Sequence, residues 1–208
     1  MKNKLNLLAL FCISLVLARM LYAQNIKLIF LIWNLFLAWI PYITSSKLTR
    51  VNIQDKLKFY GLMAICVLFL PNAIYLVTDL IHLKPRAIVP FWFDVVILFS
   101  YSVMGLIYST MSLIQLEKIL SKLVSSRWIL PSFIFLAFVS GFGVYMGREL
   151  RWNSWDAIIH PMAVILDCGH KLIHPMNYPA AYGFTLIYGA IQFLFWYVFR
   201  NISLQKNS

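Results

Sequence analysis

The sequence predicts an all-α fold, an integral membrane helical bundle of about six transmembrane helices with one short interfacial or re-entrant helical segment. Of the 208 residues, 62% are hydrophobic and 12% are charged, and the mean hydropathy is +0.78. Soluble domains contain about 45–50% apolar and about 25% charged residues, so this composition indicates a membrane protein. Within a single domain, residues 1–208, the apolar runs predict spans at residues 5–22, 28–43, 57–81, 91–116, 128–146 and 180–199, and residues 148–179 form an extracytoplasmic segment.

The positive charge lies in short clusters between the apolar runs. The net charge is +11, and the loop from Thr44 to Lys58 carries several basic residues against a single acid, Asp55. Loops rich in Lys and Arg face the cytoplasm, so we expect this loop and, with six spans, both termini on the cytoplasmic side. The same distribution argues against a nucleic-acid partner, because a basic face is missing.

The first span follows Lys2 and Lys4, a charged start that also resembles a signal peptide. We expect an uncleaved first helix. Arg19 lies late in this apolar run, where a charge is costly. We expect it either to extend to the outer surface or to pair with a carboxylate from another helix.

The third span combines a proline with a polar stripe. Pro71 cannot donate a backbone hydrogen bond, so it should kink or open the helix over residues 67–72 and free a carbonyl that Asn72 is placed to satisfy. At about 100° per residue, the stripe occupies roughly 80° of one helical face. Polar and ionisable groups at membrane depth mark a site or bind neighbouring helices. The stripe consists of Asn72, Tyr75, Asp79 and His82.

The next two spans supply an acid and a packing motif. Asp94 lies in the first turn of the fourth span, where the helix dipole favours an anion. Gly143 and Gly147, near the end of the fifth span, have the spacing that allows two helices to approach closely.

The segment after the fifth span is too short in its apolar parts to cross a bilayer, so it should be interfacial or re-entrant. Asn153 or Ser154 can cap a short helix that begins near Trp155, with Asp156 in its first turn. Pro161 should either kink that helix or open a second one over residues 161–168.

Most of the acids and all four histidines gather at the predicted outer end of the bundle, and three interpretations follow. In an acid–base site, Asp79 would orient His82 for proton transfer. In a metal site, His170 and His174 would be ligands, although Gly169 and Pro175 make a helix there doubtful. In a structural network, the charges would only join helix ends.

Other chemistry finds no support in the sequence. Cys12, Cys66 and Cys168 are scattered without a zinc-binding spacing, and no phosphate-binding glycine loop or nucleophile elbow is present. The sequence therefore assigns no metal ligand and no cofactor, and the metal site at His170 and His174 stays an open alternative.

Three stretches, in this order and spacing, resemble a known family. They run from Leu70 to Leu83, from Trp92 to Asp94 and from Gly143 to Asp156. They are similar to those of the domain of unknown function 1361 family of bacterial integral membrane proteins. The resemblance implies a small multi-pass protein of the bacterial plasma membrane. It implies no activity and supplies no catalytic residues.

The leading functional hypothesis is an outer-facing site that binds, and in one version modifies, an anionic or amphipathic envelope component such as a lipid head group. Its partners would be membrane lipids, and a homo-oligomer is left open. The alternatives are a small transporter or permease subunit gated by the Pro71 kink, and a structural or assembly protein without a ligand. In the site, Asp79 and His82 would be catalytic, and the binding residues would be Asn72, Tyr75, Asp94, Arg148, Arg151, Asn153, Trp155 and Asp156.

Overall fold

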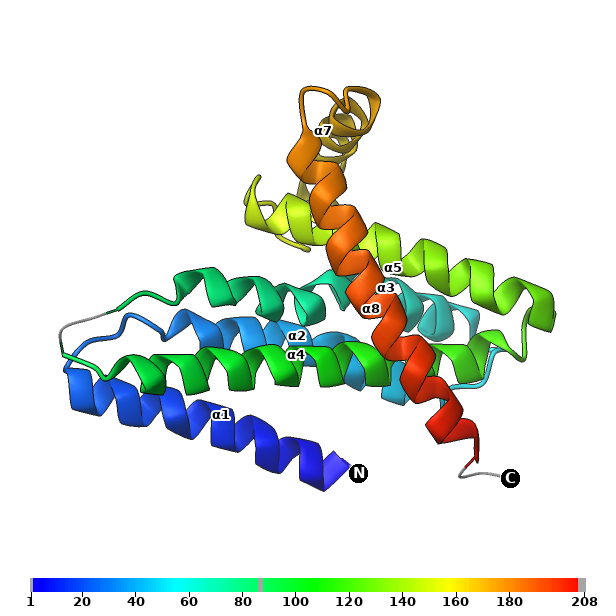
Figure 1. Ribbon diagram of the computed structural model, residues 1–208. Helices are drawn as coiled ribbons and strands as arrows, with labels where there is room; N and C mark the ends of the chain where they lie inside the picture. The colour runs from blue at the N-terminus through cyan, green and yellow to red at the C-terminus, as the bar shows by residue number, and fades with distance from the viewer. Residues whose placement is uncertain (1, 86–87, 206–208) are drawn as a thin grey trace.

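A computed structural model describes residues 2–85 and 88–205, and helices make up most of this part of the chain (Figure 1). The long helices α1–α4 lie side by side, α5 lies against α3, and α8 crosses the bundle obliquely. In chain order the elements are α1 (Lys2–Ala23), α2 (Phe30–Leu48), α3 (Lys56–Thr78), the 3-10 helix η1 (Asp79–His82), α4 (Phe91–Leu120), α5 (Ser126–Arg148), α6 (Asp156–Ile159), α7 (Pro161–Ile173) and α8 (Pro179–Gln205).

Among the described residues, five helices are long and apolar enough to cross a membrane, namely α1, α3 with η1, α4, α5 and α8. The helical membrane bundle is thus confirmed, and the protein is a multi-pass membrane protein. The predicted span 28–43 corresponds to α2, which does not meet the same standard because it contains Asn34 and Pro41 and ends in polar residues. It nevertheless packs along α3 and α4.

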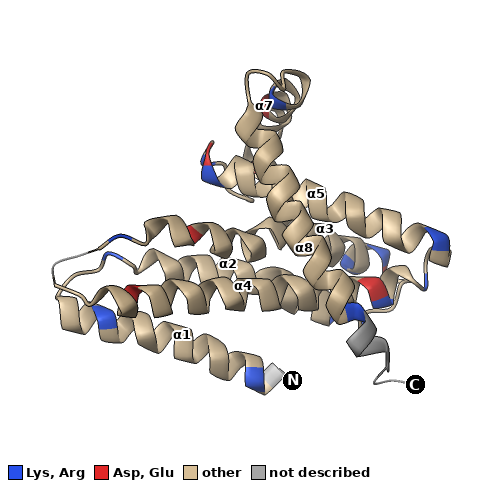
Figure 2. Cartoon of the chain, viewed as in Figure 1, with Lys and Arg blue, Asp and Glu red and all other residues tan. Residues whose placement is uncertain are grey.

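Charged residues lie mainly at helix ends and in loops, so long stretches of the helices carry none (Figure 2). Arg19 is an exception, because it lies within α1 and is fully buried. Its Nε donates to Asp94 Oδ1 at 2.8 Å. Of the two outcomes expected for Arg19, pairing with a carboxylate of another helix is therefore the one observed.

Glycines set the closest approaches between helices. A Cβ at Gly143 would lie 2.6 Å from Pro71 Cγ, and one at Gly105 would overlap the carbonyl oxygen of Ala73. Gly147 is less tight, since its Cβ would lie 3.5 Å from the Tyr75 ring. The predicted role in helix packing is thus confirmed for Gly143, which fixes α5 against α3, whereas a side chain at Gly147 would make only an ordinary contact.

Helix α3 continues from Lys56 to Thr78 through Pro71. Of the two outcomes expected at this proline, a kink or an opening, the helix therefore does not open. The side-chain amide of Asn72 donates to the carbonyl of Phe69 at 3.2 Å rather than to the one freed by the proline. The ring of Pro71 instead fills the space left by Gly143 on α5.

The segment after α5 forms two helices. Pro161 opens α7 at its first position instead of kinking α6, and α7 continues through Gly169 to Ile173, beyond the predicted 161–168. The N-cap residue of α6 is Trp155, and no side chain forms a capping hydrogen bond there. The predicted cap by Asn153 or Ser154 is therefore wrong.

Candidate functional site

Asp79 is the centre of a buried hydrogen-bond network at the junction of α3 and η1. Its side chain is fully buried. Asn34 on α2 donates to its Oδ2 at 2.8 Å, and Arg148 at the end of α5 donates to its Oδ1 at 3.1 Å. The carboxylate therefore joins three helices, and its charge is balanced by that of Arg148.

Arg148 has further partners around its guanidinium. It donates to the Tyr75 hydroxyl at 3.1 Å and to the carbonyl of Thr78 at 3.2 Å, and its Nη2 lies 3.2 Å from Nε2 of His82. A guanidinium has only hydrogen-bond donors, so Nε2 of His82 would be the acceptor in this contact. The His82 ring also packs edge-on against Phe30. We call Asn34, Tyr75, Thr78, Asp79, His82 and Arg148 the Asp79 network.

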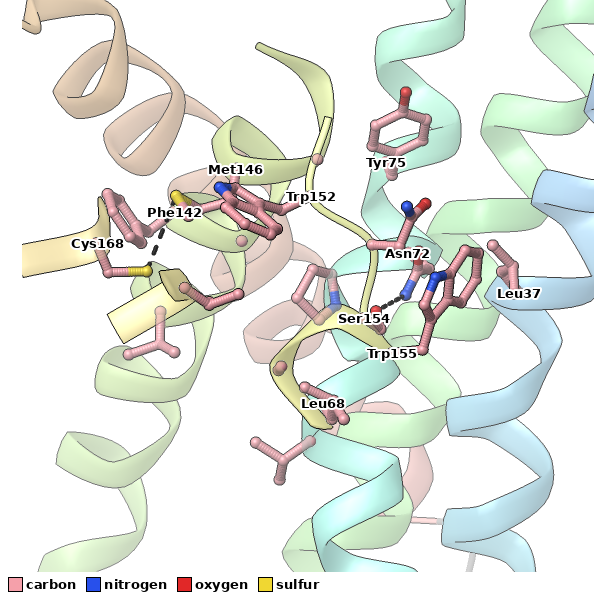
Figure 3. A pocket seen from close by; sticks show the side chains of 18 of the residues that line it. Leu37, Leu68, Asn72, Tyr75, Phe142, Met146, Trp152, Ser154, Trp155 and Cys168 are labelled. Atoms are coloured by element: carbon pink, nitrogen blue, oxygen red, sulfur yellow. Dashed lines mark hydrogen bonds between the residues drawn. The ribbon is translucent and has the colours of Figure 1, made fainter. Parts of the chain in front are cut away.

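A cavity of about 360 Å³ lies beside this network, between α2, α3, α5, α7 and the segment that joins α5 to α6 (Figure 3). We call it the Asn72 cavity. Asn72 donates to Ser154 Oγ at 2.7 Å across its wall. Asn34 and Tyr75 belong both to this wall and to the Asp79 network, so the two features share two side chains.

The wall of the Asn72 cavity differs from one side to the other. Asn72 and Tyr75 on α3, with Asn153 and Ser154 on the joining segment, supply polar groups, and Trp33 packs against Trp155 with ring centroids 6.4 Å apart. The α5 and α7 side is apolar and is formed by Val139, Phe142, Met146 and Val164. Among the described residues, none of those lining the cavity is charged.

A second cavity, of about 280 Å³, lies between η1, α5 and α8. Thr78, Arg148, Glu149 and Tyr188 contribute to its wall. Arg148 therefore reaches this cavity and, through Tyr75, the Asn72 cavity as well.

Contacts from α7 hold the joining segment in place. Trp152 Nε1 donates to Asp167 Oδ2 at 2.8 Å, and Lys171 lies 3.1 Å from Asp167 Oδ1. Burial acts to raise the pKa of Asp167, but the hydrogen bonds from Trp152 and Lys171 and the charge of Lys171 outweigh it, so the pKa lies below its ordinary value. Burial, followed by the charge of Asp167, raises the pKa of the Cys168 thiol, which lines the cavity.

The structure brings together most of the residues that the sequence singled out. Asp79, His82, Tyr75 and Arg148 are in direct contact, and Asn72 meets the joining segment. The residues Asn72, Tyr75, Asn153 and Trp155 line one cavity.

Three of the predicted site residues lie elsewhere. Asp94 pairs with Arg19 instead of joining the Asp79 network. Arg151 is exposed with φ of 60°, and takes no part in the contacts of Asp79. The carboxylate of Asp156 accepts bonds from the backbone and side chain of Asn153, at 2.7 and 3.1 Å.

Asn34, Trp33 and Ser154 were not assigned to the site by sequence reasoning. The signal for Asn34 was present, because an amide inside an apolar run needs a partner. Ser154 had been interpreted as a helix cap, and its bond to Asn72 joins residues far apart in the chain.

The metal site considered from the sequence has no complete set of ligands among the described residues. Over residues 2–85 and 88–205, no group of three or more His, Cys, Asp or Glu side chains could hold a metal ion. His170 and His174 lie at the end of α7 with ring centroids 4.6 Å apart, and His174 Nδ1 is 3.0 Å from the His170 carbonyl.

Comparison with known proteins identifies the family but no relative of known function. The family model described as protein of unknown function (DUF1361) matches residues 33–195, and this range includes the Asp79 network and the Asn72 cavity. No curated protein and no solved structure matches the chain. Because the match covers well over half of the sequence and includes the motifs that suggested it, the chain belongs to the DUF1361 family of proteins of unknown function.

Proposed function

We propose that this membrane protein binds an amphipathic envelope component, such as a membrane lipid, in the Asn72 cavity. The observation that supports the proposal is the two-sided wall, with polar groups from Asn72 and Ser154 facing the apolar side chains of α5 and α7. A ligand with a polar head and an apolar body matches such a wall. A wholly polar solute would place polar groups against the apolar side chains of α5, where those groups would lose hydrogen bonds to water without replacement.

The volume limits what the cavity can hold. Small-molecule pockets have volumes of about 300–1,000 Å³, and the Asn72 cavity, at about 360 Å³, lies near the lower end. It therefore suits a head group with the first part of a chain rather than a whole lipid. The remainder of such a ligand would extend into the surrounding bilayer.

The charges favour a head group without net charge. The positive charge of Arg148 is compensated by Asp79 at 3.1 Å, and its N–H groups are directed at Tyr75, Thr78 and His82. Since the described lining residues are uncharged, we propose a zwitterionic or uncharged head group in preference to the anionic one that the sequence suggested. In this proposal the Asp79 network orients Tyr75, and binding rather than catalysis is the function.

Photolabelling tests the proposal. The purified protein is placed in vesicles that contain phosphatidylethanolamine with a diazirine near its head group, and cross-linked peptides are mapped by mass spectrometry. We expect adducts within residues 139–168 and weaker labelling by the matching anionic phosphatidylglycerol probe. Equal labelling by the two probes would overturn the preference for an uncharged head group.

A matched pair of variants makes the test specific. Ala157 lines the cavity, and Ala163 is exposed on α7 outside it. Ala157→Trp should fill the cavity and abolish labelling of residues 139–168, while Ala163→Trp should leave it unchanged. Labelling that survives Ala157→Trp would overturn the site and leave the structural or assembly role as the better account of the Asp79 network.

A transporter is the second candidate, supported by polar groups inside the bundle. Gln192 on α8 donates to Ser109 on α4 at 2.7 Å. Gln192 Oε1 and Thr110 Oγ1 are buried without a protein partner in the described part of the chain. A Ser109→Cys variant in sealed vesicles tests this role. Reaction with a membrane-impermeant thiol reagent supports a water path to α4, and lack of reaction argues against one.

A further inference from the structure

We infer that α7 lies in the plane of the membrane interface, with its outer face among the acyl chains of the bilayer. This inference concerns a surface and holds whether or not the Asn72 cavity takes a ligand. The outer face consists of large apolar side chains that are 54–73% exposed, namely Met162, Ile165, Leu166, Leu172 and Ile173. We call them the outer face of α7.

The two faces of α7 are reversed relative to a helix on a water-soluble protein. At about 100° per residue, the outer face occupies roughly 120° of the helix. The opposite side carries Asp167 and Lys171, together with Val164 and Cys168, which line the Asn72 cavity. A helix covered by water directs its apolar stripe inward. Here the charged side chains face the protein and the apolar stripe faces outward, which matches a lipid environment.

Chain connectivity and helix length limit where α7 can lie. Two candidate membrane spans enclose the segment, because α5 ends at Arg148 and α8 begins at Pro179. With 13 residues, α7 is about 20 Å long and cannot cross the hydrocarbon core, which is about 30 Å thick. Figure 1 shows α7 to one side of the α1–α4 bundle, near the start of α8.

Specific contacts fix which face of α7 points outward. The Tyr182 hydroxyl at the start of α8 donates to the carbonyl of Leu172 at 2.6 Å. Lys171 Nζ lies 4.1 Å from the centroid of the Tyr178 ring, and Trp152 binds Asp167. Because these bonds hold the polar side against the protein, the helix cannot turn its apolar side inward without losing them. The bilayer is therefore the partner that this face fits.

Spin-label accessibility tests the inference. Single nitroxide labels are attached at Ile165→Cys and Ile173→Cys in a Cys168→Ser background, in which Cys12 and Cys66 remain buried. The protein is reconstituted in vesicles of phosphatidylethanolamine and phosphatidylglycerol. Collision rates with oxygen, which concentrates in lipid, and with a water-soluble nickel chelate are then measured.

Two control labels give the collision rates expected in lipid and in water. Leu186→Cys lies on an exposed apolar face of α8, and Gln54→Cys lies in a polar loop. We expect both α7 labels to match Leu186→Cys, with oxygen collisions exceeding nickel collisions. A ratio like that of Gln54→Cys would show a water-facing helix and overturn the inference. Low access to both reagents with dipolar broadening would assign the face to a second copy of the chain and would equally overturn it.

Discussion

The Arg19–Asp94 and Arg148–Asp79 pairs use the same chemistry in different surroundings. The first joins α1 to α4 at 2.8 Å, with side chains 0% and 3% exposed. The second joins α5 to η1 at 3.1 Å, with Arg148 12% exposed and Asp79 0% exposed. Arg148 borders a cavity, whereas neither Arg19 nor Asp94 lines the two cavities described above.

The difference separates a structural contact from a candidate site. Arg19 is held by Asp94 and Asn25, and its Nη2 is buried without a partner in the described part of the chain. Arg148 instead shares Tyr75 with the Asn72 cavity. A buried ionic pair therefore does not identify a site by itself. The adjoining cavity and the two shared side chains, Asn34 and Tyr75, make the Asp79 region the better candidate.

The largest effect is expected from breaking the more deeply buried pair. Asp94→Ala leaves the Arg19 guanidinium in the interior of the bundle with Asn25, and should destabilise the protein by about 3–5 kcal/mol. Thermal unfolding of the detergent-purified protein, followed by size-exclusion chromatography, measures the loss. Replacing both partners by apolar residues, Arg19→Met with Asp94→Leu, should recover most of it. An unchanged melting temperature in Asp94→Ala would show that the pair is not structural.

Breaking the pair of Arg148 and Asp79 should destabilise the protein less. In Asp79→Ala, Arg148 keeps the Tyr75 hydroxyl and the Thr78 carbonyl and has some access to water. We expect a loss of about 1.5–3 kcal/mol, the range for hydrogen bonds to charged groups. The same melting assay compares the variant with Asp94→Ala. A larger loss in Asp79→Ala than in Asp94→Ala would reverse the comparison and favour a purely structural role for the Asp79 network.

The position of Arg148 relative to Asp79 depends on how closely α5 approaches α3, and this gives the next prediction. In Gly143→Ala the new Cβ would lie 2.6 Å from Pro71 Cγ, a rigid ring atom. Such overpacking costs about 1–3 kcal/mol. Gly147→Ala is the matched control, because its Cβ would make an ordinary contact at 3.5 Å. Equal melting temperatures for the two variants would show that the α3–α5 distance is not fixed by Gly143.

Local patterns in the sequence were sufficient to predict the membrane bundle and the polar stripe that contains Asp79. Span prediction needs only apolar length, and the stripe needs only helical periodicity. The spacing of Gly143 and Gly147 indicated where another helix can approach α5 closely. These features depend on residues within about two helical turns of each other, so they can be predicted without knowledge of the tertiary structure.

Long-range pairing could not be predicted in the same way. Sequence reasoning grouped Asp94 with Asp79, because both lie near predicted outer ends of helices, yet rotation of α4 directs Asp94 to Arg19. The bond between Asn72 and Ser154 spans 82 positions in the chain. The continuation of α7 through Gly169 shows that contacts such as Trp152 with Asp167 override the low helix propensity of glycine.

The smallest effect concerns an ionic pair that is more exposed than either of these, Asp167 with Lys171. Because burial and then the charge of Asp167 raise the pKa of the Cys168 thiol, removing that charge should lower it. In Asp167→Asn the midpoint of the pH–rate profile for alkylation of Cys168 by iodoacetamide should move to lower pH, since the thiolate is the reactive form. Mass spectrometry of the Cys168 peptide measures the rate.

Two comparisons separate this electrostatic effect from loosening of α7. A loosened helix would raise the plateau of the profile at high pH without moving its midpoint, because exposure and ionisation are distinct requirements for reaction. Asp156→Asn is the control, since Asp156 lies in the same segment but bonds to Asn153. A midpoint that moves equally in both variants would mean that Asp167 has no specific influence on the thiol. Movement in Asp167→Asn alone would show that even this more exposed pair changes the acidity of a thiol in the cavity wall, where Arg148 of the buried pair donates to the Tyr75 hydroxyl.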